Sequence, residues 1–339
     1  MRRLSLAVIG GGVIGLWQAF ELARRGHVVA LYEIRDEAAT GASSRLAGAM
    51  LAPYCEAEAA EPIIVELGLR GLALWRAAYP GIVSHGTLVV AAARDQGELT
   101  RFARMTNGHR PIDAGEVVRL EPDLADRFAR GLFYPDEAHV APRAALAWLA
   151  AQVRRLGGQL HFGVPAADVL TLAAGRDAVI DCRGIAARHD LAELRGVRGE
   201  MALIRTAEVA LSRPVRLLHP RFPLYVVPWG EGLYMVGATV IEREDAGPVT
   251  VRSALELLGT AYALHPAFGE AAVIELSAGV RPSLPNNMPK VIVRGRHVSV
   301  NGAHRHGYLL APVLAELTAS FLEMGATDAR IFVSEGQNG

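Results

Sequence analysis

Lysine is almost absent from this chain of 339 residues, because Lys290 is the single lysine among 35 Lys and Arg residues. The sequence therefore contains no G-x-x-x-x-G-K-[ST] phosphate loop. A Schiff-base mechanism would have to use Lys290. This scarcity argues against kinases, P-loop ATPases and most pyridoxal enzymes.

Cysteine is scarce as well, with only Cys55 and Cys182 in the chain. Two cysteines cannot build a disulfide framework, and they cannot form a structural zinc site on their own. We therefore expect a reducing, cytoplasmic location. No apolar run approaches the roughly 18 residues of a membrane-spanning helix, so we expect no integral membrane span.

Neither sign of charge is in surplus, since 35 Lys and Arg residues balance 35 Asp and Glu residues. Without a basic surplus to neutralise phosphates, a nucleic-acid partner is not expected. Hydrophobic residues make up 51% of the chain and charged residues 21%, which is typical of a globular protein with a sizeable core. At this length we expect two domains, or one large domain with an insertion.

The first 33 residues predict a strand, a helix and a second strand, at residues 4–9, 13–25 and 27–32. The turn between the first strand and the helix reads Gly10-Gly11-Gly12-Val13-Ile14-Gly15 and fits G-x-G-x-x-G. In such a turn the first glycine permits the tight bend, the second lets the backbone approach a pyrophosphate, and the third allows close helix–strand packing. The alternative is a tight turn without a ligand.

Glu33 ends the second strand, 33 − 15 = 18 residues after the last glycine of the turn. An acid at this position is expected to accept hydrogen bonds from a ribose. It argues against a 2′-phosphate and hence against NADP, but it does not separate NAD from FAD. A loop of small residues then covers residues 40–53, where backbone N–H groups can press against a flat ligand.

The remaining pattern predicts further elements that alternate between helix and strand. We expect helices at 62–79, 94–110, 142–156, 251–264 and 311–324, the last opening with Pro312, and strands at 86–93, 178–182, 197–205, 224–227, 232–240, 291–293 and 297–300. The strand at 178–182 is expected to rejoin the sheet of the first unit. Residues 228–231 have the composition of a hairpin turn.

Six segments together are similar to the D-amino-acid oxidase superfamily, and within it to glycine oxidases of the ThiO type. These segments are 47–53 (AGAMLAP), 139–143 (HVAPR), 197–201 (VRGEM), 236–239 (VGAT), 278–282 (AGVRP) and 301–312 (NGAHRHGYLLAP). Two features depart from the family pattern: Asn286-Asn287 stands where an Asp-Gly pair is common, and the C-terminal loop reads GAHRHG rather than GHYRNG. These departures concern substrate preference and flavin tuning rather than the fold.

The resemblance implies an α/β fold with a Rossmann-like FAD-binding domain of the D-amino-acid oxidase type. Three stretches, 1–83, 141–200 and 275–339, would form this discontinuous domain. Residues 84–140 and 201–274 would form an interleaved substrate-binding domain with an antiparallel or mixed sheet.

The resemblance also implies FAD as the cofactor. It would be bound non-covalently, because neither cysteine lies near the C-terminal segment through which flavinylated relatives attach the ring. The residues expected to bind FAD are Gly10, Gly12, Val13, Ile14, Gly15, Glu33, Arg35, Ser43, Ser44, Ala47, Gly48, Met50, Val164, Gly302, His304, Arg305, His306, Gly307 and Tyr308.

Three residues are candidates for the catalytic site. Arg281 lies between Gly279 and Pro282, which predicts a rigid turn, and an arginine fork held there suits capture of a substrate carboxylate. By composition alone a surface ion pair would be the alternative, but the family places its carboxylate-binding arginine in this segment. Tyr225 and Arg305 correspond to the family's active-site tyrosine and to a loop beside the flavin. The pair His304 and His306 lacks a third ligand, so no metal is expected.

The function implied by the resemblance is oxidation of a small amine, with glycine expected first and sarcosine or small D-amino acids next. The substrate and molecular oxygen would give an imine and hydrogen peroxide, and the imine would hydrolyse to glyoxylate and ammonia or feed thiazole synthesis for thiamine. The resemblance leaves a homo-oligomer open.

Alternatives remain at this point. One is a D-amino-acid or sarcosine oxidase, or a dehydrogenase that passes electrons to a quinone. Another is an NAD-binding reductase or a non-catalytic nucleotide sensor. A flavin absorbance spectrum of the purified protein would exclude the NAD interpretation.

Overall fold

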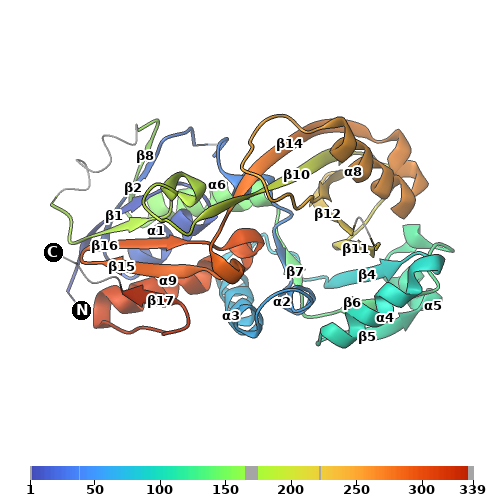
Figure 1. Ribbon diagram of the computed structural model, residues 1–339, viewed down its shortest axis with the longest axis horizontal. Coiled ribbons are helices and arrows are strands. Elements are labelled where there is room, and N and C mark those ends of the chain that lie inside the picture. Colours follow the sequence, from blue (N-terminus) through green and yellow to red (C-terminus); the bar gives the residue numbers. More distant parts are fainter. Residues whose placement is uncertain (1, 38, 165–174, 221–222, 335–339) are drawn as a thin grey trace.

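The computed structural model describes residues 2–37, 39–164, 175–220 and 223–334. Two large sheets lie side by side in it, each with its own helices (Figure 1). Within the described residues, seven strands form the first sheet in the order β17-β15-β16-β9-β1-β2-β8. Their bounds are β1 Ser5–Ile9, β2 Val28–Glu33, β8 Gln159–Phe162, β9 Ala178–Asp181, β15 Lys290–Arg294, β16 His297–Asn301 and β17 Phe332–Ser334.

The first sheet is mainly parallel, since β8, β2, β1, β9 and β16 all run in one direction. The helices packed with this sheet include α1 (Val13–Arg24), α3 (Pro62–Ala78), α6 (Pro142–Arg155) and α9 (Gly307–Met324). Four residues of β1 are buried, which explains its continuous apolar sequence. The prediction that residues 178–182 rejoin this sheet is confirmed by the parallel pairing of β9 with β1.

The second sheet is mixed and holds eight described strands in the order β14-β10-β13-β12-β11-β4-β6-β5. Their bounds are β4 Thr87–Ala91, β5 Arg110–Asp113, β6 Arg130–Tyr134, β10 Arg195–Arg205, β11 Val215–Leu218, β12 Leu224–Gly230, β13 Leu233–Gly237 and β14 Ala272–Ser283. The helices of this part are α4 Gln96–Met105, α5 Ala114–Leu120 and α8 Val251–Leu264. A second apolar core lies between α8 and the sheet.

Short elements connect the two sheets. Strand β3 (Met50–Leu51) pairs with β7 (Ala138–His139), and the one-turn helix α2 (Pro53–Glu56) follows β3 directly. The 3₁₀ helices are η1 Ser43–Leu46, η2 Ala93–Asp95, η3 Pro122–Leu124, η4 Gly184–Ala187, η5 Pro266–Glu270, η6 Pro285–Asn287 and η7 His304–His306. Among the described helices, none combines the length and the apolar character needed to cross a membrane.

Outside the C-terminal helix, three local predictions were wrong. The helix expected at 94–110 ends at Met105, and β5 occupies the end of that range. The hairpin turn expected at 228–231 is shifted, because β12 runs to Gly230 and the turn is made by Glu231 and Gly232, both at positive φ. Arg281 lies within the strand β14 rather than on a turn.

The C-terminal helix begins at Gly307, earlier than the predicted start at residue 311, so Pro312 lies inside α9. A proline inside a helix leaves the carbonyl four residues earlier without its usual N–H partner. That carbonyl belongs to Tyr308, and it accepts a hydrogen bond from the buried Trp75 indole at 2.6 Å. Helix α3 comes close enough to supply this donor because its residue Gly71 has no side chain. A Cβ at this position would lie 1.9 Å from the Leu309 carbonyl oxygen.

The chain passes from the first sheet to the second and back twice. Strands from 5–33, 159–181 and 290–334 form the first sheet, and strands from 87–134 and 195–283 form the second. Strands β10 and β14 each run across an expected domain boundary, at 200/201 and 274/275. The division into two domains at those boundaries stays a prediction.

Candidate active site

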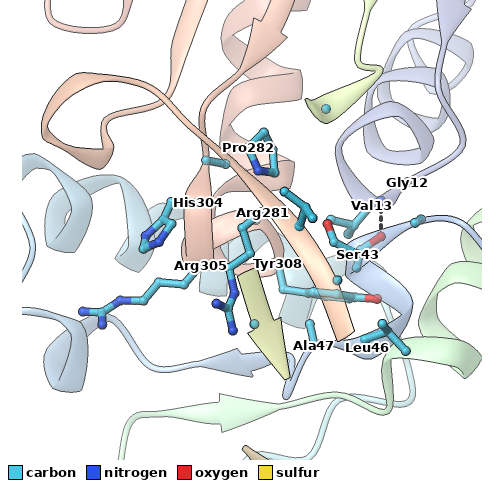
Figure 2. Close-up of a pocket in the computed structure, with 18 of the residues that line it drawn as sticks. Gly12, Val13, Ser43, Leu46, Ala47, Arg281, Pro282, His304, Arg305 and Tyr308 are labelled. Carbon is cyan, nitrogen blue, oxygen red and sulfur yellow. Dashed lines mark hydrogen bonds between the residues drawn. The ribbon is translucent and has the colours of Figure 1, made fainter. Parts of the chain in front are cut away.

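One cavity of about 620 Å³ is lined by residues of both sheets. It extends from the glycine turn after β1 to strands β12 and β14 of the second sheet, and Figure 2 shows part of its lining. Of the predicted site residues, these line it: Gly10, Gly12, Val13, Ile14, Glu33, Arg35, Ser43, Ser44, Ala47, Gly48, Met50, Val164, Tyr225, Arg281, His304, Arg305, His306, Gly307 and Tyr308. Gly15 and Gly302 do not.

The glycine turn is shaped by close backbone contacts. Gly10 has φ +104°, and a Cβ on it would lie 2.5 Å from the Cys182 carbonyl oxygen. A Cβ on Gly15 would lie 1.9 Å from the Gly10 carbonyl oxygen, so Gly15 serves helix–strand packing rather than ligand contact. Gly12 borders the cavity, and no atom would lie nearer to its added Cβ than Ser44 Oγ at 3.4 Å. The turn therefore leaves an open cradle at the start of α1.

Glu33 faces this turn from the end of β2. Its Oε2 accepts a hydrogen bond from Gly11 N at 2.5 Å, and its Oε1 accepts one from Arg35 N at 2.9 Å. The N-cap residue of helix α1 is Gly12, which offers no capping side chain, and the N–H of the first helical residue, Val13, donates to Ser44 Oγ at 3.2 Å (Figure 2). A helix N-terminus next to glycines suits a pyrophosphate, and the adjacent carboxylate suits a ribose. These residues fit FAD.

The small-residue loop links the cofactor end of the cavity to the second sheet. Its residues Ser43 and Ala47 line the cavity together with Arg281 and Tyr308, and Figure 2 labels all four. A Cβ on Gly48 would lie 2.9 Å from the Tyr225 ring, so only glycine allows the loop to approach this closely.

Arg281 is the cation with the most unusual surroundings. Its guanidinium lies over Gly199 of the neighbouring strand β10, where an added Cβ would be 2.1 Å from Nη2. Nη1 donates to the Thr239 carbonyl at 3.1 Å. Within the described part of the chain, no carboxylate lies at ion-pair distance from it. Burial lowers the pKa of Arg281, opposed by nearby Tyr225.

Tyr225 stands directly opposite Arg216 on the paired strands β12 and β11, and both residues line the cavity. Burial raises the pKa of Tyr225, so its hydroxyl keeps its proton at neutral pH. Arg216 is paired with Glu58 at 2.9 Å. Arg281 therefore differs from Arg216, because its charge has no acid beside it.

Arg305 is also paired with an acid. Its Nε lies 2.7 Å from Glu56 Oε2, and His306 Nδ1 lies 3.3 Å from the same oxygen. In Figure 2 the side chain of Arg305 extends away from that of Arg281. The pKa of Glu56 is lowered: burial acts to raise it, but Arg305 and His306 outweigh that effect.

The two histidines of the loop are neutral at physiological pH. Burial lowers the pKa of His304 to about 3, with a further contribution from Arg281, and lowers that of His306 to about 4. Within the described ranges, His, Cys, Asp and Glu side chains nowhere gather in a group of three or more that could hold a metal.

Sequence reasoning missed four charged residues of the cavity lining, Glu56, Arg183, Glu200 and Arg216, of which Glu56 and Arg216 are the ones that bear on the arginines above. Glu56 ends the single turn of α2, and its partner Arg305 lies far away in the sequence. Arg216 is brought in only by the register of β11 with β12. No local spacing signals either residue; the nearest hint is Pro53, which marks the start of a helix beside the small-residue loop.

Comparison with known proteins is consistent with this geometry. The profile of the family described as FAD dependent oxidoreductase (DAO) matches residues 5–321. A Rhizobium etli protein named as a thiamine biosynthesis oxidoreductase, ThiO, is 49% identical over 336 residues, which covers 98% of each chain.

Two further comparisons concern Geobacillus kaustophilus. A glycine oxidase of this organism is 27% identical over 362 residues, covering 96% of this chain and 94% of the relative. A crystal structure of glycine oxidase from the same organism superposes with a TM-score of 0.80 at 25% identity, over 97% of this chain and 96% of the other. The chain therefore belongs to the DAO family of FAD-dependent oxidoreductases, and FAD is its cofactor.

Proposed function

We propose that this enzyme oxidises glycine, with sarcosine and small D-amino acids as weaker substrates. The observation that carries the proposal is the unmatched charge of Arg281. Arg305 is paired with Glu56 and Arg216 with Glu58, whereas Arg281 has no acid partner among the described residues. A buried cation without a partner is costly unless a ligand supplies the anion. The cavity is thus suited to a substrate with one carboxylate.

Arg281 would bind that carboxylate through its planar fork, and Gly199 provides the space in which the fork lies. The Tyr225 hydroxyl, held protonated by burial, can donate a hydrogen bond to the carboxylate or accept one from the amine. We assign Arg305 a secondary role in setting the potential of the site, because Glu56 offsets most of its charge.

The substrate amine would react in its neutral form. Two carboxylates line this end of the cavity: Glu56 is already engaged by Arg305 and His306, and Glu200 by Arg198 and the Thr239 hydroxyl. An ammonium would therefore find no free anion, and the amine loses its proton to solvent before oxidation. No protein base is required, so the residues act chiefly by holding the Cα–H bond in position.

When bound, FAD would supply the acceptor for the hydride that leaves Cα with its two electrons. We propose molecular oxygen as the final electron acceptor. Loss of the hydride and of an amine proton converts glycine to the imine, and water then releases glyoxylate and ammonia. Two electrons and two protons reduce oxygen to hydrogen peroxide. We propose that the lining residues predicted from the sequence hold the cofactor.

Support for the substrate comes from the names of the relatives, which are glycine oxidase and the thiamine biosynthesis oxidoreductase ThiO. By the same likeness we propose that the product serves thiazole synthesis for thiamine. The two buried free cysteines suit a reducing, cytoplasmic compartment.

The test is an oxygen-electrode comparison of glycine, sarcosine, D-alanine and D-proline on FAD-loaded protein. We expect glycine to give the highest kcat/KM, with hydrogen peroxide formed in equal amount to oxygen consumed. A second candidate is favoured by the apolar wall that Met50, Met201 and Met235 contribute to the cavity, which would accept a larger side chain or an N-substituent. Preference for D-proline or sarcosine, or turnover with a quinone but not with oxygen, would favour that candidate.

A further inference from the structure

Glu137 is a fully buried acid that lies outside the cavity lining and takes no part in the proposed reaction. It immediately precedes β7, the strand that pairs with β3. Its Oε1 accepts a hydrogen bond from Cys55 N at 2.8 Å. Its Oε2 has no hydrogen-bond partner among the described residues. One oxygen of this carboxyl group is thus hydrogen-bonded to the backbone of α2.

Helix α2 needs such an external acceptor. It has a single turn, Pro53–Glu56, and the residue before it, Ala52, provides no side-chain cap. The N–H groups of a first turn have no partner within the helix, and an acceptor must come from elsewhere. Pro53 lacks an N–H, and Cys55 is the third helical residue, the position that a capping side chain usually reaches. Glu137 fills this role from a distant part of the chain.

The last residue of the same turn is Glu56, which contacts Arg305 and His306 in the cavity wall. Because Cys55 directly precedes Glu56 in this single turn, a shift of the α2 backbone moves the Glu56 carboxylate. We propose that Glu137 is a positioning residue, which fixes α2 through Cys55 N and thereby keeps Glu56 on Arg305 and away from Arg281. This proposal rests on the proposed role of Arg281 in carboxylate binding.

The consequence concerns substrate affinity. Glu56 is one of the charges that act on Arg281 and on Tyr225. If α2 moved, the freed Glu56 carboxylate would compete with the substrate carboxylate for the unmatched cation. Affinity for carboxylates would then fall, while turnover at saturating substrate would change little.

The test compares Glu137→Asp with Glu137→Gln in the FAD-loaded enzyme. Aspartate keeps the charge but withdraws the oxygen by one methylene, whereas glutamine keeps the length and an oxygen that can accept from Cys55 N. The probe is acetate, whose dissociation constant is measured from the change in flavin absorbance. We expect Glu137→Asp to raise the acetate Kd and the glycine KM about five- to tenfold, with kcat within about twofold. Glu137→Gln should stay within about twofold of the parent in all three.

Two controls separate this role from general destabilisation. Glu121 is also fully buried and pairs with Arg213 away from the cavity, so Glu121→Asp should leave the acetate Kd unchanged. In an Arg305→Ala background Glu56 is already released, and Glu137→Asp should add less than about twofold.

Three results would overturn the inference while leaving glycine oxidation intact: an unchanged Kd in Glu137→Asp, an equal rise in Glu137→Gln, or full additivity with Arg305→Ala. A parent enzyme that neither binds acetate nor oxidises glycine would instead overturn the proposed function.

Discussion

Replacing Arg281 by alanine gives the most decisive test of the site. The substrate carboxylate would then be buried beside Tyr225 without a counter-ion, because Arg305 and Arg216 are already paired with Glu56 and Glu58. Removing one member of a buried charge pair typically costs about 2–5 kcal/mol, which corresponds to a loss of roughly 30- to several-thousand-fold in kcat/KM for glycine.

Stability should respond in the opposite sense to activity. Arg281 is buried without an acid partner among the described residues, so its removal relieves a desolvated charge, and the Tm of the apoprotein should be unchanged or higher. Arg213 makes a matched control, because it is a buried arginine that does pair with an acid, Glu121. Arg213→Ala should lower the Tm while leaving kcat/KM of the folded protein near that of the parent.

The assay is oxygen consumption with glycine, together with the flavin spectrum and inhibition by acetate. Arg281→Ala should retain the flavin spectrum and lose acetate inhibition, and Arg281→Lys should recover activity only in part, because an ammonium cannot reproduce the planar fork. Wild-type kcat/KM in Arg281→Ala with FAD bound would refute the carboxylate role. Arg305, released from Glu56, would then be the first alternative.

Four further results are expected. Glu33→Ala should fold but lose FAD on dialysis, because a charge-assisted hydrogen bond to the ribose is worth about 1.5–3 kcal/mol; retention equal to the parent would contradict the ribose role. Gly199→Ala should raise the glycine KM without loss of FAD, since the new Cβ would lie 2.1 Å from the Arg281 guanidinium; an unchanged KM would mean that the guanidinium is not held there. Flavin reduction at subsaturating glycine should quicken toward alkaline pH, because the substrate amine loses its proton. The two cavity histidines, with pKa values lowered to about 3 and 4, do not titrate in that range, so a flat profile would argue against reaction of the neutral amine. Burial raises the pKa of Glu137 to about 7, so the stability it contributes is complete below its unfolded pKa near 4.3 and is lost by the time the pH has risen through 7. Glu137→Gln should therefore flatten the fall in Tm between about pH 4.5 and 7.5, and an unchanged fall would assign it to other groups.

The cofactor end of the cavity was accessible to sequence reasoning because its determinants are local. The glycine turn and Glu33 lie within one βαβ unit, and each has a steric or hydrogen-bonding task that its residue type reveals. The structure places Gly10 at positive φ and Gly15 in contact with the Gly10 carbonyl, as the pattern predicts.

The turn predicted around Arg281 was wrong because two of its neighbours occur in this structure within a strand. Gly279 and Pro282 are typical turn residues, yet both lie in the strand β14. Gly279 faces η1, where an added Cβ would lie 3.4 Å from Ser43 and Leu46. A glycine and a proline in a strand look the same in the sequence as a glycine and a proline in a turn, so the sequence alone does not distinguish the two.

The selectivity of the cavity depends on features that no motif records. Arg216, Arg281 and Arg305 are the same residue type, and all three line the cavity. What separates them is the acid that the fold brings to each: helix α2 carries Glu56 to Arg305, and the segment that follows it brings Glu58 to Arg216. Arg281 receives a backbone carbonyl instead of a carboxylate. A buried guanidinium attracts an anion most strongly when no internal acid competes for it. Within the described residues, the arginine that binds substrate is therefore identified by the absence of an acid beside it. That absence becomes visible only when the pairings of the other arginines are known.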